Sequence, residues 1–162
     1  MGPTNNIGYL IQRLAFCLGR QSDQVLQDKL GIGLSQFKIL MILQWHPSIL
    51  QKHIAEALGQ TEASVSRQIK VLQKQGYLET RVTPENRREH ITKLSKSGVR
   101  AAERAIEELN TYHSPTFARL SESQLNELHE ALTKLYDAAC QRDNFRQDLH
   151  HQLKGHKLKG GA

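Results

Sequence analysis

A short segment in the middle of the chain concentrates side chains that can hydrogen-bond to nucleic-acid bases and phosphates. Its polar members are Thr61, Ser64, Ser66, Arg67, Gln68 and Lys70. A guanidinium can donate two hydrogen bonds to guanine, and a glutamine amide can pair with adenine. Glu62 is the exception, because its carboxylate repels phosphate, although it suits the positive end of a helix dipole or can accept from cytosine. The segment is a candidate base-reading surface.

The apolar residues of the same segment indicate which way it faces. Val65, Ile69 and Leu72 are spaced four and three residues apart, which predicts a helix that buries this side. Ser64, Arg67 and Gln68 then lie on the outer side. An ordinary amphipathic surface helix is the alternative interpretation.

A second group of arginines follows in the sequence. Arg87 and Arg88 lie in a turn that contains Pro84 and Asn86, and Arg81 precedes it. Guanidinium groups on a protruding loop can enter a narrow minor groove, where the potential is most negative. A solvated turn is the plain alternative.

The elements around these residues predict a helix-turn-helix. Apolar spacing predicts one helix from Leu50 to Leu58, which Gly59 closes. A second helix starts at Thr61, a suitable N-cap, and ends at Gly76. Two helices joined by a tight turn at a glycine form the helix-turn-helix motif.

A β-hairpin is expected directly after this motif. Residues 77–83 and 88–94 have strand-like apolar positions and flank the basic turn. The predicted fold is therefore mainly α, a winged helix-turn-helix with a small β-hairpin wing, together with N- and C-terminal dimerisation helices.

Long helices are predicted on both sides of the wing domain. The first covers residues ~6–29 and is broken by Gly31 and Gly33, and the second is capped by Ser35 and ends near Trp45. Another begins after Ser95 and is interrupted by Pro115 near residue ~113.

The last helix carries an apolar seam. Ser121 and Gln124 form a capping-box pattern. The apolar residues that follow at spacings of three and four are Leu125, Leu128, Leu132, Leu135 and Ala139. Such a seam pairs helices, and we expect pairing between two chains rather than within one.

These elements divide the chain into four expected parts. Residues 1–33 form an N-terminal dimerisation helix, and residues 34–98 form the winged helix-turn-helix DNA-binding domain. Residues 99–149 form C-terminal dimerisation helices, and residues 150–162 form a His- and Lys-rich tail that we expect to be disordered.

The charge distribution favours an anionic partner. The chain has 162 residues, 22 Lys and Arg against 16 Asp and Glu, and a formal net charge of +6. Residues 51–100 carry ten basic and five acidic side chains, so the excess lies around the predicted motif. No apolar run is long enough to cross a bilayer, and two cysteines are too few for a disulfide scaffold. We expect a cytoplasmic protein without a secretory signal or membrane contact.

Several motifs together resemble the MarR family of bacterial and archaeal transcription regulators. They lie within residues 34–98 and are Leu34-Ser-Gln-Phe37, Ile54-Ala-Glu-Ala-Leu58, Ser64-Val-Ser-Arg67, Leu72-Gln-Lys-Gln-Gly76-Tyr-Leu78, Pro84-Glu-Asn-Arg-Arg88 and Leu94-Ser-Lys-Ser-Gly98. The resemblance implies a homodimer that binds a pseudo-palindromic operator in double-stranded DNA, typically as a repressor. It also implies that Arg88 enters the minor groove. Asn86 departs from the family's Asp at that position and cannot form the usual ion pair with the arginine.

The resemblance leaves the switching signal open. Family members often release DNA when a small aromatic or anionic ligand binds, and Arg13, Trp45 and His46 are candidate lining residues; an ordinary interface is the alternative. A second branch senses oxidants through a cysteine near the first helix, where Cys17 is the candidate. Cys17 nevertheless occupies an apolar position of the helix, which favours a buried, unreactive core cysteine. A bond between Cys17 and Cys140 is a further option.

Other classes of function have weaker support. A winged helix that binds proteins would expose apolar anchors rather than basic side chains. The sequence has no Gly-rich phosphate loop and no nucleophile motif, so we expect no catalytic residues, no cofactor and no enzyme. His53 and Glu56 are one turn apart but form no active site. His150, His151 and His156 lack partner ligands, so we expect no functional metal site.

Overall fold

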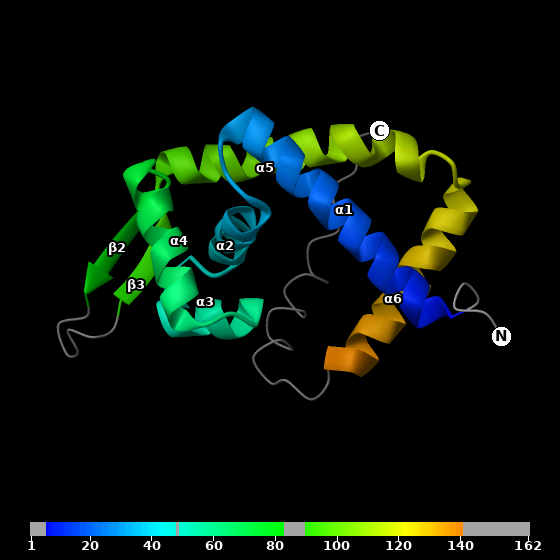
Figure 1. The fold of residues 1–162 in the computed structure, drawn as a ribbon, viewed down its shortest axis with the longest axis horizontal. Helices are drawn as coiled ribbons and strands as arrows, with labels where there is room; N and C mark the ends of the chain where they lie inside the picture. The colour runs from blue at the N-terminus through cyan, green and yellow to red at the C-terminus, as the bar shows by residue number, and fades with distance from the viewer. Residues whose placement is uncertain (1–5, 48, 83–89, 141–162) are drawn as a thin grey trace.

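The computed structural model describes residues 6–47, 49–82 and 90–140 (Figure 1). The elements in chain order are α1 (Ile7–Leu30), α2 (Leu34–Trp45), β1 (Ile49–Leu50), α3 (Gln51–Leu58), α4 (Glu62–Lys74), β2 (Leu78–Val82), β3 (His90–Leu94), α5 (Lys96–Phe117) and α6 (Glu122–Cys140). The described residues are mainly helical and contain one small sheet. The predicted winged helix-turn-helix fold is confirmed.

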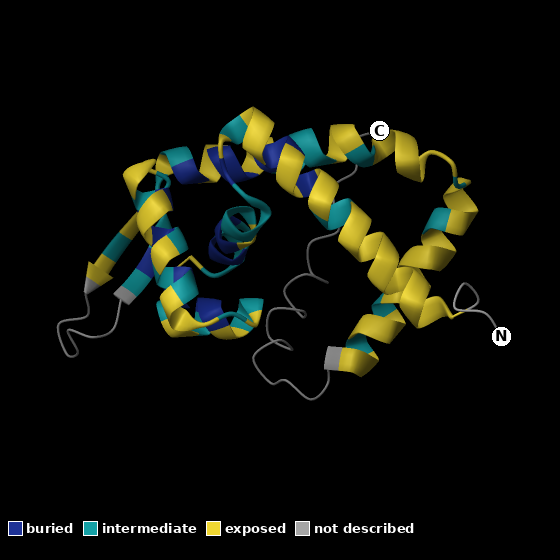
Figure 2. Ribbon diagram, viewed as in Figure 1, coloured by how far each residue is buried: buried dark blue, intermediate teal, exposed yellow. Residues whose placement is uncertain are grey.

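The core is built around α2, which lies in the middle of a lobe formed with α3, α4, the sheet and the first half of α5 (Figure 1). Ile39, Leu40, Ile42 and Leu43 of α2 are all buried. Figure 2 shows the buried residues concentrated in this lobe, whereas the N-terminal half of α1 and all of α6 are largely exposed. One hydrophobic core therefore holds the lobe together and leaves the other end of the molecule uncovered.

The sheet has the strand order β1-β3-β2, and both pairings are antiparallel. β2 and β3 pair from Leu78 opposite Leu94 to Val82 opposite His90, which confirms the predicted hairpin. β1 was not predicted, because a strand of two residues is too short to show alternation. It pairs with β3 and so fastens the start of α3 to the wing.

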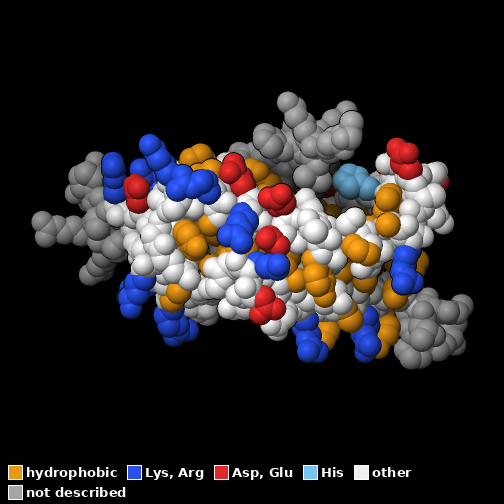
Figure 3. Space-filling model, turned by 90° about the horizontal axis from the view of Figure 1, so that it is seen from above, with side chains coloured by type: hydrophobic (Ala, Val, Ile, Leu, Met, Phe, Trp, Pro, Cys, Tyr) orange, Lys and Arg blue, Asp and Glu red, His pale blue; other side chains and the backbone are white. Residues whose placement is uncertain are grey.

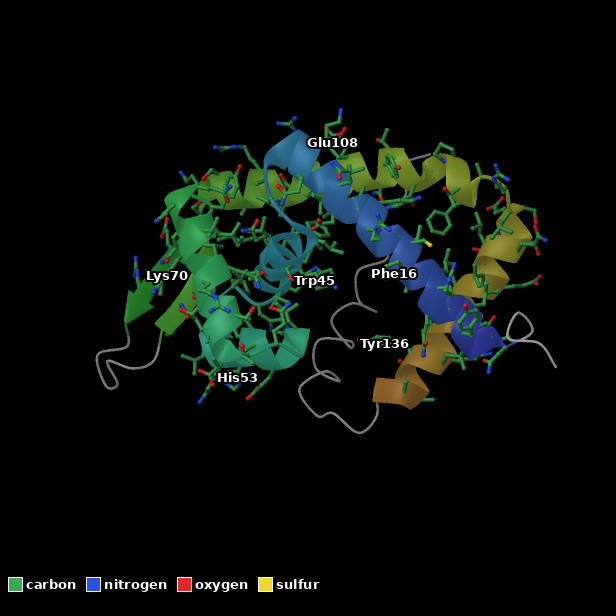
Figure 4. The ribbon with its side chains drawn as sticks, viewed as in Figure 1. Phe16, Trp45, His53, Lys70, Glu108 and Tyr136 are labelled. Atoms are coloured by element: carbon green, nitrogen blue, oxygen red, sulfur yellow. The ribbon has the colours of Figure 1, made fainter. Side chains whose placement is uncertain are left out.

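α1 packs against α5, and polar contacts add to the apolar ones that both helices make with the core. Ser22 is buried, and its hydroxyl lies 3.0 Å from Nε2 of His113. Lys29 and Glu108 form an ion pair at 4.0 Å (Glu108 is labelled in Figure 4). These contacts link the N-terminal helix to the helix that leaves the lobe.

The start of α2 differs from the prediction by two residues. Ser35 is inside the helix, and Gly33 occupies the N-cap position. The free amides are satisfied from elsewhere: Gln36 accepts from the amide of Gly33 at 2.8 Å, and Asp23 of α1 accepts from that of Leu34 at 2.7 Å. Ser35 is consequently free to use its hydroxyl in a tertiary contact.

The end of α5 also differs, because the helix passes through Pro115 and ends at Phe117. Proline fits a helical φ, but it removes its own amide donor and its ring crowds the carbonyl four residues earlier. The amide of Ala118 nevertheless donates to the carbonyl of Ser114 at 2.9 Å, so the last turn still closes. The helix therefore continues two residues beyond the proline.

α6 begins with the predicted capping box. The amide of Gln124 donates to the Ser121 hydroxyl, and the Gln124 side chain accepts from the amide of Ser121. None of the α6 side chains that the structure describes is buried. Its apolar seam is therefore not covered by any other described part of the chain.

Candidate nucleic-acid interface

The turn between α3 and α4 sets the direction of the second helix. Gly59 ends α3 in the left-handed conformation, with φ of 62°, which glycine adopts without strain. Two residues later the Thr61 hydroxyl accepts a hydrogen bond from the amide of Ser64 at 3.2 Å and caps α4. The predicted glycine at the end of α3 and the predicted N-cap of α4 are both confirmed, and with the two helices they form a helix-turn-helix.

The face of α4 that packs into the core is the face predicted from the apolar spacing in the sequence. Val65, Ile69 and Leu72 are all buried in the core of the lobe. On the opposite side Arg67 and Lys70 are exposed. The helix thus presents a charged outer face while its apolar side holds it to α2 and α3.

The remaining predicted residues of α4 lie between these two faces or at its start. Thr61 and Glu62 are exposed at the N-terminus, where the Glu62 carboxylate complements the helix dipole. Ser64, Ser66 and Gln68 are half-buried. The outer face is therefore narrower than the list of polar residues suggested, with Arg67 at its centre.

Gln68 already has hydrogen-bond partners within the lobe. Its Nε2 donates to Oε1 of Gln60 at 2.9 Å and to the hydroxyl of Ser64 at 3.3 Å. Gln60 in turn donates to the hydroxyl of Ser35 on α2 at 2.9 Å. The sequence analysis did not single out Gln60 or this role of Ser35, because neither belongs to the periodic pattern of a helix.

The base of the wing lies beside α4. Arg81 is exposed on β2, opposite Ile91 of β3. Across the same two strands Lys93 donates to Glu79 at 3.0 Å, which holds the pKa of this exposed carboxyl below its usual value. Arg87, Arg88 and Asn86 lie outside the described residues.

Figure 3 shows Lys and Arg side chains at the end of the molecule that carries the wing and also along its middle and far half, among hydrophobic side chains. Figure 4 places Lys70 on α4, on the side of the lobe where β2 and β3 lie. α4 and the two strands carry Arg67, Lys70, Lys74, Arg81 and Lys93, and so form a basic end. Such an end can neutralise phosphates along a duplex.

A close joint connects this end to α5, and sequence reasoning missed it. The hydroxyls of Ser95 and Ser97 both donate to the carbonyl of Gly76, at 2.6 and 2.7 Å. Gly98 packs so tightly on the backbone that a Cβ there would lie 2.0 Å from the carbonyl oxygen of Tyr77. The wing and α4 are thereby fixed to the start of α5.

The three residues predicted to line a ligand site come from two regions, α1 and the end of α2. Arg13 is exposed on α1 with its guanidinium 6.0 Å from the ring centre of Tyr9. Trp45 and His46 are half-buried at the end of α2. Among the described contacts, none joins Arg13 to Trp45 or His46.

Two polar atoms at the end of α2 are buried without a hydrogen-bond partner. They are Oε1 of Gln44 and Nε2 of His46, on either side of Trp45 in the sequence. Buried polar atoms are normally satisfied. This pair of atoms suits a polar ligand or ordered water.

Cys17 differs from the expectation of an inert core position, because it is exposed on α1. No element in residues 6–47, 49–82 and 90–140 covers the N-terminal half of α1, so an apolar helical position there still faces solvent. The side chain of Cys140 is outside the described part.

The structure shows no metal or membrane feature in the part of the chain that it describes. No group of three or more His, Cys, Asp or Glu side chains in residues 6–47, 49–82 and 90–140 is arranged to hold a metal ion. No described helix is long and apolar enough to cross a membrane.

The fold and the basic end define a winged helix-turn-helix DNA-binding protein. Residues 30–89 match the sequence model of the MarR family. A Bacillus cereus protein named as an uncharacterized HTH-type transcriptional regulator is 27% identical over 136 residues, which cover 82% of this chain and 90% of the relative.

Solved structures show the same fold. The apo form of MarR from E. coli aligns over 80% of this chain and 96% of its own, with a TM-score of 0.73 and 21% identity. A mutant MarR complexed with operator DNA covers 77% of this chain and 92% of its own, with a TM-score of 0.62 and 21% identity. CouR from Rhodococcus jostii RHA1 bound to p-coumaroyl-CoA covers 83% of this chain and 94% of its own, with a TM-score of 0.68 and 16% identity.

Residues 30–89 of the chain are therefore similar to the MarR family, and most of the chain is similar to a protein named as an HTH-type transcriptional regulator. The family resemblance drawn from the motifs of residues 34–98 is confirmed.

Proposed function

We propose that this regulator is a homodimeric repressor that binds a pseudo-palindromic operator through residues 34–98 of each chain. The exposed face of α4, with Arg67 at its centre and its apolar side buried, is the observation that carries the proposal. In a helix-turn-helix the second helix enters the major groove. The solved complex of MarR with operator DNA supports the same role for this fold.

Apolar surface at the far end of the molecule supports a dimer. Exposed apolar residues line both uncovered helices, and they include Ile7, Leu10, Leu14 and Phe16 of α1 with Leu128, Leu132, Leu135 and Tyr136 of α6. Figure 4 places Phe16 and Tyr136 away from the DNA-binding lobe. Burying this surface against a second copy removes it from water and spaces two lobes for two half-sites.

Release by a small ligand is the switching mechanism that we propose. The buried, unpartnered Oε1 of Gln44 and Nε2 of His46 flank Trp45 and supply polar and aromatic contacts for an aromatic ligand. The structure of CouR bound to p-coumaroyl-CoA shows that one protein of this fold holds an aromatic acyl ligand. Arg13, exposed on α1, is the candidate partner for a carboxylate of the ligand.

Oxidation of Cys17 is the alternative switch. Its exposure favours this alternative, because an exposed thiol is open to an oxidant, whereas a buried one is not.

One selection experiment tests the function and separates the two switches. The full chain is bound to random duplexes over a range of salt, and retained duplexes are sequenced with reduced and peroxide-treated protein side by side. An inverted repeat, retained more weakly as salt rises, is expected for the reduced protein. Loss of binding only after oxidation, and not in Cys17→Ser, would favour the redox switch. If no sequence is enriched at any salt, the proposed operator recognition is wrong.

A further inference from the structure

Four side chains form a hydrogen-bonded series that links α2 to α4 across the helix-turn-helix. The hydroxyl of Ser35 accepts from Gln60, Oε1 of Gln60 accepts from Gln68, and Gln68 also donates to Ser64. Gln60 is in the turn between α3 and α4 (Figure 1). It therefore joins the recognition helix to the helix at the centre of the core.

Both amide nitrogens of this hydrogen-bonded series have partners, and Oε1 of Gln60 accepts within it. Oε1 of Gln68 is buried without a hydrogen-bond partner. All four side chains are half-buried, and the two hydrogen bonds donated by Nε2 hold Gln68 in the lobe. A glutamine held in this way loses the rotational freedom that it needs to reach a base edge.

Arg67, the residue before Gln68, is in the opposite situation. Its side chain is exposed on the outer face of α4, clear of the buried Val65, Ile69 and Leu72. Arg67 and Gln68 are adjacent, and both have side chains of a type that can recognise bases, but the fold places them differently. Arg67 faces outward, where DNA would bind, whereas Gln68 is hydrogen-bonded to the turn.

We propose that Gln60 is a specificity-determining positioning residue, which holds the amide of Gln68 inside the lobe so that Arg67 alone of the two reads bases. The inference rests on the proposed entry of α4 into the major groove. Without Gln60, the amide of Gln68 is released toward the outer face and adds an adenine contact.

The test is a comparison of base preferences by selection from random duplexes, using the full-length protein. Gln60→Met removes the acceptor at similar volume, and we expect a new preference for adenine of about tenfold at one position of each half-site. Gln68→Met alone keeps the wild-type preference, because Gln68 does not read a base there. The double variant Gln60→Met with Gln68→Met loses the new preference.

Gln60→Glu is the conservative control. Its carboxylate still accepts from Gln68 and from the Ser35 hydroxyl, so the wild-type base preference is retained. Overall affinity falls, since the added negative charge lies near phosphates. A purely structural role would not give a preference that depends on Gln68, so thermal unfolding of each variant need only show that it is folded.

The outcomes distinguish this inference from the function on which it rests. If Gln68→Met changes base preference while Gln60→Met does not, Gln68 reads the base directly and the inference is wrong. It is also wrong if neither variant changes preference while Arg67→Ala does, which leaves the role of α4 intact. If Arg67→Ala has no effect either, the proposed role of α4 is wrong as well.

Discussion

Arg67 is the side chain on the outer face of α4 that is best suited to base recognition. It is exposed, it carries a planar fork of donors, and no ion pair in the described residues restrains it. Lys70 lies one turn further along and offers a point charge that suits phosphate rather than a base edge. The two residues should therefore contribute in different ways.

Arg67→Ala should weaken operator binding by about 10- to 100-fold and relax preference at one base pair, because a bidentate contact contributes ~1–3 kcal/mol. Fluorescence anisotropy with the operator and single-base variants measures both effects. Lys134→Ala on α6 is the control, since it removes the same charge away from the basic end. Unchanged preference in Arg67→Ala would mean that the face assigned to the major groove is wrong.

Lys70→Ala should weaken binding to all duplexes by a similar factor and leave base preference as it is. Loss of one phosphate contact lowers the slope of log K against log salt by about 1. A salt titration on operator and random duplex checks this slope for the variant and the wild type. A change in base preference instead would assign Lys70 to the group of base-reading residues.

The joint between the wing and α5 is the feature that matters most at the scale of elements. Ser95 caps α5 by accepting from the amide of Gly98, and Ser95 and Ser97 also donate to the carbonyl of Gly76, where α4 ends. Gly98 is required because Tyr77 lies against it. A rigid joint here transmits the position of α5 to the recognition helix and the wing.

Gly98→Ala should destabilise the protein by about 3 kcal/mol, since a Cβ would collide with backbone rather than with a flexible side chain. Urea unfolding followed by circular dichroism measures the change. Gly19→Ala in α1 is a matched control: its Cβ would meet only Cδ2 of Leu34 at 3.7 Å, and alanine favours the helix by up to about 1 kcal/mol. Equal stabilities for the two variants would contradict the packing described for the joint.

One end of the molecule has a buried hydrophobic core, and the other end exposes apolar side chains to solvent. The lobe around α2 contains the buried core, whereas α1 and α6 expose large apolar side chains such as Phe16 at 63% and Leu135 at 53% (Figure 2). A surface of this kind marks an interface. Within one chain nothing else that the structure describes covers it.

Leu132→Lys combined with Leu135→Lys should convert the proposed dimer to a monomer, because two charges would be buried at the interface. Sedimentation velocity measures the state, and circular dichroism should show that the lobe stays folded, since neither leucine belongs to its core. Asn126→Lys adds a charge to another side of α6 and should leave the dimer intact. A wild-type protein that is monomeric at all concentrations would refute the dimer.

The sequence by itself determined the local structure of this regulator. The spacing of Val65, Ile69 and Leu72 predicted which side of α4 is buried, and Thr61 and Gly59 predicted where the helix-turn-helix turns. These features depend on helical periodicity and on capping, both of which act between residues a few positions apart. The basic end could be predicted for the same reason.

Only the tertiary structure decided which of the predicted polar residues are available to contact DNA. Gln68 has the right chemistry to read adenine, but its partner Gln60 is eight positions away and is itself held by Ser35, twenty-five positions away. Likewise β1 exists only because β3, some forty residues later, supplies its partner. Cys17 is exposed because no part of the described chain folds over that end of α1. Long-range contacts leave no periodic signal in a sequence, so the fold had to bring these residues together before their roles could be assigned.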